Sequence, residues 1–396
     1  MNWSTDDRQY MGLALQLAKK GQYTARPNPM VGCVIVNEGK VVGQGWHQKS
    51  GLAHAEINAL KQAGENARNA TCYVTLEPCS HVGKTGSCAE ALVKAGVTRV
   101  IVAMTDPNPL VQGRGFAILN RAGLNEAGIE THRGLLESQA KELNKGFISK
   151  FEKQRPWVSL KLAMSLDGRT ALDDGSSKWI TGKAARFDVQ QLRARQDAII
   201  TGIGTVLADD PSLNIRGDDN ENSHQQQWFS KLENFEQPIR ILLDRNSQAE
   251  VNSKFFSPDS FFNDRLVENN GHGVNKTKQN VWWVVGDPSI KKESVAENIK
   301  LLGEDSLESL LKKCTQADMN NVLIEAGHRL AGKFIQRNLV DEIIVYMAPK
   351  LMGNDALGLF DLSVSKMSDC YPLDLQSVRQ FGDDIRLIYR PKSIDS

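Results

Sequence analysis

The chain has 396 residues, and its 48 Lys plus Arg nearly balance its 47 Asp plus Glu, for a net charge of +1. The length favours two domains, and the balanced charge provides no long-range attraction to nucleic acid. No apolar run is long enough to span a bilayer, and the N-terminus lacks the pattern of a secretory signal. Six cysteines in a chain of this size are not a disulfide framework, so we expect a reducing, cytoplasmic location.

The first half of the chain alternates between helical and extended apolar spacing. We expect helices at 5–20, 54–63, 88–95 and 135–150, and strands at 31–36, 40–46, 71–75 and 97–104. This alternation predicts an α/β sandwich, in which functional residues gather at strand ends and helix starts. A polar segment that ends at Pro156 breaks the pattern. We therefore assign residues 1–150 to one domain and residues 151–396 to a second.

The second half has the same alternation and predicts another α/β domain. We expect strands at 157–163, 198–201, 239–244, 281–285, 322–325 and 342–348, and helices at 182–195, 307–314 and 330–338. Two polar, turn-rich segments, 217–236 and 263–279, are predicted to be surface loops inserted between these elements.

A histidine and two cysteines in the first half have the spacing of metal ligands. His54 opens a predicted helix, Cys79 follows a predicted strand, and Cys88 begins another helix. One imidazole and two thiolates could hold tetrahedral zinc and leave the fourth position open to water. A closed structural zinc site would need four protein ligands, usually in two close pairs, and we expect only these three candidates to lie near one another. The remaining cysteines, Cys33, Cys72, Cys314 and Cys370, are predicted to be thiols of the core.

The carboxylate of Glu56 lies two residues after the predicted histidine ligand. Such a group can take a proton from a zinc-bound water and return it to a departing amino group. The pattern His-x-Glu…Pro-Cys…Cys is the signature of zinc nucleobase deaminases. In the usual form two residues separate the cysteines, whereas eight separate Cys79 from Cys88.

The longer spacing is explained by a more specific resemblance. The runs 43–47, 54–56 and 75–85 together resemble the deaminase domain of the bifunctional riboflavin-biosynthesis deaminase/reductase family, which has a long loop between its cysteines. The resemblance implies a cytidine-deaminase-like α/β/α fold for this half. It also implies a substrate pocket lined by Asn28, His47, His81, Lys84, Asp106 and Asn108. That family has two prolines before the second cysteine, and this chain has Gly86-Ser87 instead.

Glycine-rich segments in the second half are weak signals on their own. The run 202–205 follows a predicted strand, but Leu207 occupies the third glycine position of a dinucleotide-binding fingerprint. The run 327–333 has the spacing of a phosphate loop, but Phe334 replaces the Ser or Thr that would bind Mg²⁺. A nucleotide triphosphatase is therefore disfavoured. A strand followed by a helix N-terminus still suits the phosphates of a cofactor.

The runs 161–169, 177–181, 205–211 and 325–327 resemble the reductase domain of the same family. The resemblance implies a dihydrofolate-reductase-like fold and an NADPH site that includes Ala163, Trp179, Thr205, Asp209, Gly327, His328, Arg329, Leu330, Ala331, Gly332 and Lys333. It implies substrate contacts from Ser177, Arg193, Leu213, Arg216 and Glu325, with the arginines suited to a phosphate. Lys161 is a candidate proton donor; an ordinary strand lysine is the alternative.

We therefore expect a bifunctional enzyme of riboflavin biosynthesis. It would use one Zn²⁺ to deaminate a phosphorylated diaminopyrimidinone and NADPH to reduce its ribosyl chain, as a homo-oligomer without nucleic-acid or membrane partners. One alternative is a nucleic-acid deaminase, which would bind RNA tightly and with strong salt dependence. A second is a non-catalytic zinc protein, which Glu56 beside the ligands argues against. A third is a degenerate reductase half that serves only in oligomerisation, which saturable NADPH binding would exclude.

Overall fold

The computed structural model describes residues 2–80, 86–122, 129–218, 220, 222–232, 235–257, 280–291, 295–304 and 306–392. The chain divides into two compact units, Met1–Arg155 and Pro156–Ser396. The second unit begins at the proline that ends the polar segment, whereas a division after residue 150 would fall inside helix α6 (Lys145–Glu152). Among the described residues, no helix is long and apolar enough to cross a membrane.

The first unit contains a five-stranded sheet in the order β2-β1-β3-β4-β5. The strands are β1 (Gly32–Asn37), β2 (Lys40–Trp46), β3 (Thr71–Leu76), β4 (Arg99–Met104) and β5 (Glu130–Arg133). Strand β1 pairs antiparallel with both β2 and β3, while β3, β4 and β5 are parallel. Each predicted strand of this half therefore forms, and β5 is an additional one.

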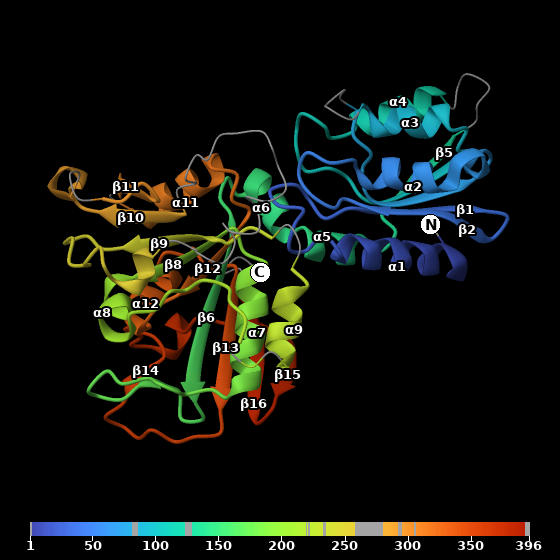
Figure 1. The fold of residues 1–396 in the computed structure, drawn as a ribbon. Helices are drawn as coiled ribbons and strands as arrows, with labels where there is room; N and C mark the ends of the chain where they lie inside the picture. Colours follow the sequence, from blue (N-terminus) through green and yellow to red (C-terminus); the bar gives the residue numbers. More distant parts are fainter. Residues whose placement is uncertain are drawn as a thin grey trace. The chain divides into compact units, whose positions relative to one another are not determined.

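Helices cover both faces of this sheet (Figure 1). One face carries α1 (Thr5–Lys19) and α5 (Glu137–Leu143), and the other carries α2 (Ala55–Ala63), α3 (Cys88–Lys94) and α4 (Arg114–Ala122). Helix α1 begins as predicted, because the side chain of Ser4 accepts from the Asp7 amide while the Asp7 carboxylate accepts from the Ser4 amide. A short 3-10 turn, η1 (Gly64–Ala67), follows α2.

Helix α2 lies unusually close to strand β2 because Gly45 has no side chain. A Cβ at this position would lie 2.2 Å from the carbonyl oxygen of Ala55 and 2.6 Å from the amide nitrogen of Ala59. Alanine on the facing side of the helix completes the fit, since Ala55 and Ala59 are fully buried. The sequence thus places the first turn of α2, with His54 and Glu56, at a fixed depth over the sheet.

The second unit contains a nine-stranded sheet in the order β11-β10-β9-β8-β12-β6-β13-β16-β15. Its strands are β6 (Trp157–Ser165), β8 (Ala198–Gly202), β9 (Ile239–Leu243), β10 (Val281–Val285), β11 (Ile299–Gly303), β12 (Asn321–Glu325), β13 (Glu342–Ala348), β15 (Leu373–Phe381) and β16 (Asp384–Pro391). The strands from β11 to β13 are parallel, and β16 and β15 add an antiparallel edge. A separate two-stranded sheet pairs β7 (Arg169–Ala171) with β14 (Leu357–Gly358).

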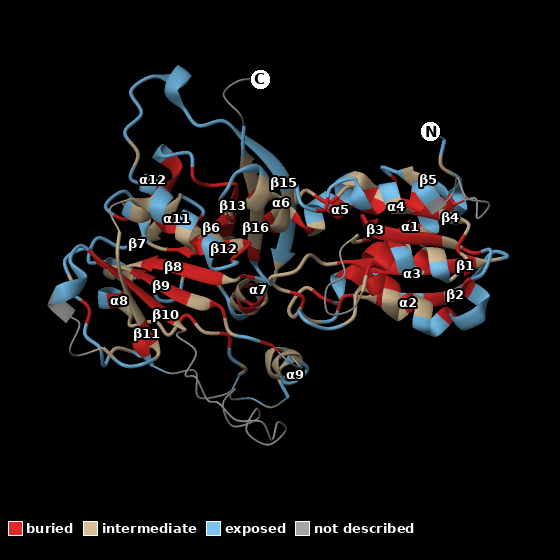
Figure 2. Cartoon of the chain, turned by 90° about the horizontal axis from the view of Figure 1, so that it is seen from above, coloured by how far each residue is buried: buried red, intermediate tan, exposed pale blue. Residues whose placement is uncertain are grey.

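The core of this unit lies on both faces of the large sheet, whose central strands are buried (Figure 2). Helices α11 (Leu307–Gln316) and α12 (His328–Gln336) pack against one face, and α7 (Lys183–Ala194) packs against the other. Helix α8 (Ile203–Asp209) follows β8 directly. The described part of this unit also contains the short 3-10 helices η3 (Lys254–Phe256), η4 (Pro288–Lys291) and η5 (Met367–Asp369). The α/β class predicted for both halves is confirmed.

Several sequence expectations were wrong in detail. The predicted helix 135–150 is two helices, α5 and α6, because Asn144 between them turns its side chain to the backbone of Met30, donating to the carbonyl and accepting from the amide. The predicted loop 217–236 contains α9 (His224–Ser230), which the side chain of Ser223 caps. Cys370 is exposed instead of buried. The segment 263–279 lies outside the described residues.

Candidate functional site

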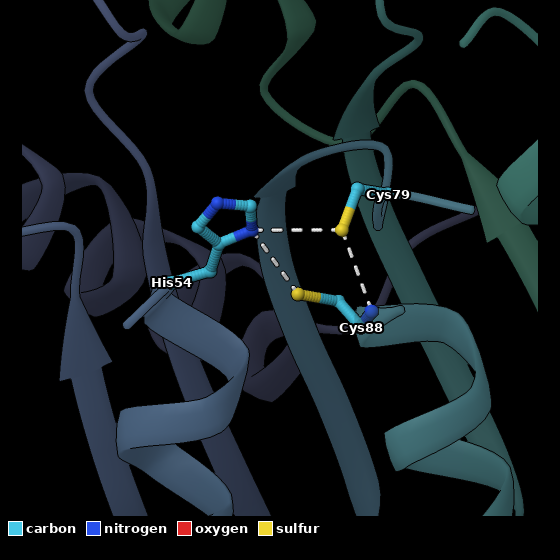
Figure 3. Close-up of side chains that lie close together, drawn as sticks. All are labelled: His54, Cys79 and Cys88. Atoms are coloured by element: carbon cyan, nitrogen blue, oxygen red, sulfur yellow. Dashed lines mark hydrogen bonds between the residues drawn. The ribbon is translucent and has the colours of Figure 1, made fainter. Parts of the chain in front are cut away.

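The three predicted metal ligands lie together where α2, β3 and α3 end or begin. His54 is the residue before α2, Cys79 follows β3, and Cys88 is the first residue of α3. Their ligand atoms all lie within 4.8 Å of one another. The Nδ1 atom of His54 is 3.5 Å from the Cys79 sulfur and 3.3 Å from the Cys88 sulfur (Figure 3). Both sulfurs face the same ring nitrogen, so Nδ1 is the imidazole atom available to a shared metal.

Ser87 holds the two cysteine segments together. Its hydroxyl donates to the carbonyl oxygen of Cys79 at 3.1 Å and accepts from the amide of Glu90 as the cap of α3. The amide of Cys88 points at the Cys79 sulfur at 3.4 Å. The serine that replaces the second proline before Cys88 therefore helps to place both sulfurs.

The contact between the two cysteines shifts the pKa values of their thiols in opposite directions. The contact with Cys88 and the neighbouring His54 lower the pKa of the Cys79 thiol to about 4, although burial opposes the shift. The contact with Cys79 and burial raise the pKa of the Cys88 thiol. A divalent cation would favour loss of the second proton, because a metal-bound cysteine is a thiolate.

Glu56 lies beside this cluster and is only 3% exposed. Burial raises the pKa of its carboxyl group to about 7. A carboxyl group with a pKa near neutrality can both accept and release a proton at physiological pH, which is what a general acid/base requires.

A buried histidine borders the cluster from the β2 side. The ring of His47 lies 5.5 Å from the ring of His54, edge to face. Its Nδ1 is 3.4 Å from the carbonyl oxygen of Ala53, and its Nε2 is 3.0 Å from the side-chain nitrogen of Asn28. Since a carbonyl can only accept, Nδ1 carries the proton and Nε2 accepts from the amide. Burial lowers the pKa of His47, so the ring is neutral beside the metal ligands.

Asp106 and Asn108 lie in the segment between β4 and α4. The Asp106 carboxylate accepts from the Asn108 amide at 2.8 Å, and the Asn108 side chain accepts from the Leu110 amide at 3.0 Å. Both residues therefore shape the turn that carries them. The amides of this turn also reach Glu77, which the sequence analysis did not single out because its partners lie about 30 residues later in the chain.

The second unit contains a cavity of about 1680 Å³ at the carboxyl ends of its parallel strands. This is where open α/β sheets bind their ligands. It is lined by most of the residues predicted to contact cofactor or substrate, namely Lys161, Ala163, Ser177, Trp179, Arg193, Thr205, Asp209, Leu213, Arg216, Glu325, Gly327, His328, Arg329, Leu330 and Lys333. The structure thus brings residues between positions 161 and 333, which are far apart in the sequence, to one site.

A buried ion network forms one wall of this cavity. Arg193 donates to both oxygens of Glu325, at 2.5 and 3.0 Å. Lys161 is paired with Glu325 in adjacent strands, and its Nζ lies 3.7 Å from the carboxylate. Burial lowers the pKa of Lys161, and the nearby Arg193 acts in the same direction. Burial alone would raise the pKa of Glu325, but Arg193 and Lys161 hold it at about 2.

Other predicted cofactor residues lie around the start of α12 and the mouth of the cavity. Gly327 precedes α12, so the predicted turn 327–333 is mostly the first part of a helix. Ala331 and Gly332 do not line the cavity; they are buried on the inward side of that helix. Trp179 is 64% exposed, and the Arg186 guanidinium lies 4.5 Å from its ring centre.

Comparisons with known proteins decide which family has this pair of sites. Residues 4–104 match the cytidine and deoxycytidylate deaminase zinc-binding region, and residues 156–387 match the RibD C-terminal domain. The riboflavin biosynthesis protein RibD of Haemophilus influenzae is 44% identical over 397 residues and covers 100% of both chains. The chain belongs to the RibD family. It is a bifunctional deaminase and reductase of riboflavin biosynthesis, as the resemblance predicted.

Solved structures agree with this membership in the RibD family. Acinetobacter baumannii RibD is 42% identical, covers 98% of this chain and 99% of its own, and superimposes with a TM-score of 0.84. A Thermotoga maritima protein described as a diaminohydroxyphosphoribosylaminopyrimidine deaminase/5-amino-6-(5-phosphoribosylamino)uracil reductase is 29% identical, with coverage of 98% and 99% and a TM-score of 0.77.

Two predicted substrate residues of the deaminase half, His81 and Lys84, lie outside the described residues.

Proposed function

We propose that the first unit hydrolyses the 2-amino group of 2,5-diamino-6-(5-phosphoribosylamino)pyrimidin-4(3H)-one. The second unit then uses NADPH to reduce the ribosyl side chain to ribityl, giving 5-amino-6-(5-phosphoribitylamino)uracil. The observation that carries the proposal is the cluster of His54, Cys79 and Cys88 beside the buried Glu56. The activities named for the Thermotoga maritima relative support the choice of substrate.

The donor set fits a catalytic zinc ion. An imidazole nitrogen and two cysteine sulfurs are the ligands that zinc prefers, and three protein ligands leave a position open. When bound, zinc lowers the pKa of water at that position and so supplies the nucleophile for hydrolysis. His54, Cys79 and Cys88 would hold the ion.

Glu56 moves protons in this proposal. Its carboxyl group, with a pKa of about 7, takes the proton of the attacking water and delivers protons to the pyrimidine ring and the departing ammonia. Both ring nitrogens of the neutral His47 are engaged by Ala53 and Asn28, so His47 would hold the Asn28 side chain in place, and Asn28 would orient the heterocycle beside the ligands through its amide group.

The cavity of the second unit would hold NADPH and the deaminated product together. NADPH supplies the hydride, and Lys161 is the proposed donor of the accompanying proton, because its lowered pKa eases proton release. Arg216 is the better candidate for the substrate phosphate. Its guanidinium contacts the neutral side chains of Ser212 and Asn214, whereas that of Arg193 is engaged by Glu325.

The test supplies the diaminopyrimidinone ribosylamine phosphate to the purified full-length protein, with and without NADPH. Ammonia should appear without cofactor, and NADPH oxidation should require prior deamination. Cys79→Ser should lose bound zinc and ammonia release but still oxidise NADPH when given the deaminated compound. Oxidation of NADPH by that variant on the undeaminated compound would contradict the proposed order.

Cytoplasmic location and a dimeric or tetrameric state remain predictions. A reducing compartment suits the site, because Cys79 and Cys88 must stay as thiols to bind a metal. Sedimentation of the purified protein would measure the oligomeric state.

A further inference from the structure

The carboxylate of Glu77 receives four backbone amides from a distant segment. The amides of Asp106 and Gly113 point to its Oε2 at 3.3 and 3.1 Å, and those of Gly115 and Phe116 point to its Oε1 at 3.0 and 3.5 Å. The side chain is 3% exposed. Every one of these partners is a donor, so the site requires a group that only accepts.

Two of these amides, those of Gly115 and Phe116, belong to the first turn of helix α4, and that of Gly113 immediately precedes it. The first amides of a helix have no partner within the helix, and a carboxylate placed there satisfies them and interacts favourably with the helix dipole. Glu77 therefore caps α4 from another part of the chain. The approach is possible only because Gly115 lacks a side chain: a Cβ there would lie 2.0 Å from the carbonyl oxygen of Pro78.

Glu77 also stands at the junction with the metal-binding segment. It follows β3, its own amide donates to Met104 at the end of β4, and Cys79 comes two residues later. The amides that it accepts bracket the turn that carries Asp106 and Asn108. One buried carboxylate thus fastens this turn directly against the segment that supplies a metal ligand.

We infer that Glu77 is a positioning residue for deamination, which fixes the 106–116 segment as a wall of the substrate pocket beside the metal. This inference rests on the proposed deaminase activity and extends it to a residue that contacts neither metal nor substrate. Replacement by glutamine keeps the shape but places an NH₂ group against one pair of amide donors. An acceptor pair is then lost, and those amides are left buried without a partner.

The experiment compares wild type, Glu77→Gln and the control Glu65→Gln, an exposed residue in η1, all as full-length protein. Hydrogen exchange followed by mass spectrometry should be faster at residues 106–116 in Glu77→Gln alone. Zinc per chain should equal that of wild type. The deaminase kcat/KM should fall about 10–100-fold, the range seen when a supporting hydrogen-bond partner is removed, with a raised KM. NADPH oxidation on the deaminated compound should be unchanged.

Wild-type exchange at 106–116 with wild-type kcat and KM in Glu77→Gln would overturn the inference. Loss of zinc in that variant would also overturn it, because Glu77 would then support the metal segment and not the substrate wall. If wild type itself releases no ammonia, the proposed function fails, yet the exchange measurement still tests whether Glu77 fixes the segment. Glu77→Asp, whose carboxylate is one methylene shorter, should show intermediate exchange and an intermediate KM.

Discussion

The two sites of this chain are built in different ways. The candidate metal site consists of His54, Cys79 and Cys88, whose ligand atoms lie within 4.8 Å of one another. The cavity of the second unit draws on residues from 161 to 357 and encloses about 1680 Å³. A metal needs a few donors at short range, whereas a dinucleotide and a phosphorylated substrate need a large surface. Replacement of a single side chain should therefore lower the activity of the first site more than that of the second.

Glu56→Gln should have the largest effect. Glutamine cannot carry the proton, so ammonia release should fall about 10²–10⁴-fold, towards the upper end because one group serves as both acid and base. Bound zinc and NADPH oxidation on the deaminated compound should be unchanged. Retention of more than a tenth of wild-type ammonia release, measured beside the zinc content, would remove Glu56 from the mechanism.

Lys161→Met should have a smaller effect on the reductase. The substitution does not alter the proposed hydride donor, so the loss of a proton donor alone should lower kcat about 10²-fold. NADPH should still bind, which isothermal titration calorimetry would measure. Deamination serves as the internal control. A wild-type reductase kcat in this variant would support the alternative of an ordinary strand lysine.

The last prediction concerns acid stability and not the rate of either reaction. Arg193 and Lys161 hold the pKa of Glu325 at about 2, below its ordinary value of 4.5. A lowered pKa in the folded state stabilises the fold above the ordinary value, and this contribution is lost as the pH falls from 4.5 towards 2. The melting temperature of the second unit should therefore drop over this window.

Glu325→Gln supplies the control for the acid transition. This substitution should weaken the dependence of the melting temperature on pH. It should also lower the free energy of unfolding near neutral pH by about 3–5 kcal/mol, because a buried ion pair is broken. The melting temperatures of both proteins are measured by circular dichroism between pH 4.5 and 2. If they fall equally with pH, Glu325 does not cause the acid transition.

The sequence predicted the elements whose signals are local. Strands β2, β10 and β13 form at the expected residues, and α1 begins at the expected position 5. The candidate metal ligands could also be predicted from the sequence, because their motif lies within a short segment. The resemblance to a known family, and not periodicity, supplied most residues of the cavity.

The features that the sequence did not predict depend on contacts between residues that are far apart in the chain. Asn144 interrupts the helix predicted over 135–150 because its side chain bonds the backbone of Met30, 114 positions away. The role of Glu77 appears only when α4 is placed above β3. Ala331 and Gly332 belong to a glycine-rich run, yet the helical turn points them inward.

The close approach of α2 to β2 at Gly45 bears on how this protein can vary. Any larger residue at position 45 would push the helix outward and carry His54 and Glu56 away from the sulfurs. In a saturation mutagenesis experiment selected for riboflavin synthesis, we expect position 45 to be as intolerant as the ligands, although Gly45 touches no reactant. Intolerance at position 45 would reflect the short distance between the backbones of α2 and β2. It would not indicate a catalytic role for Gly45.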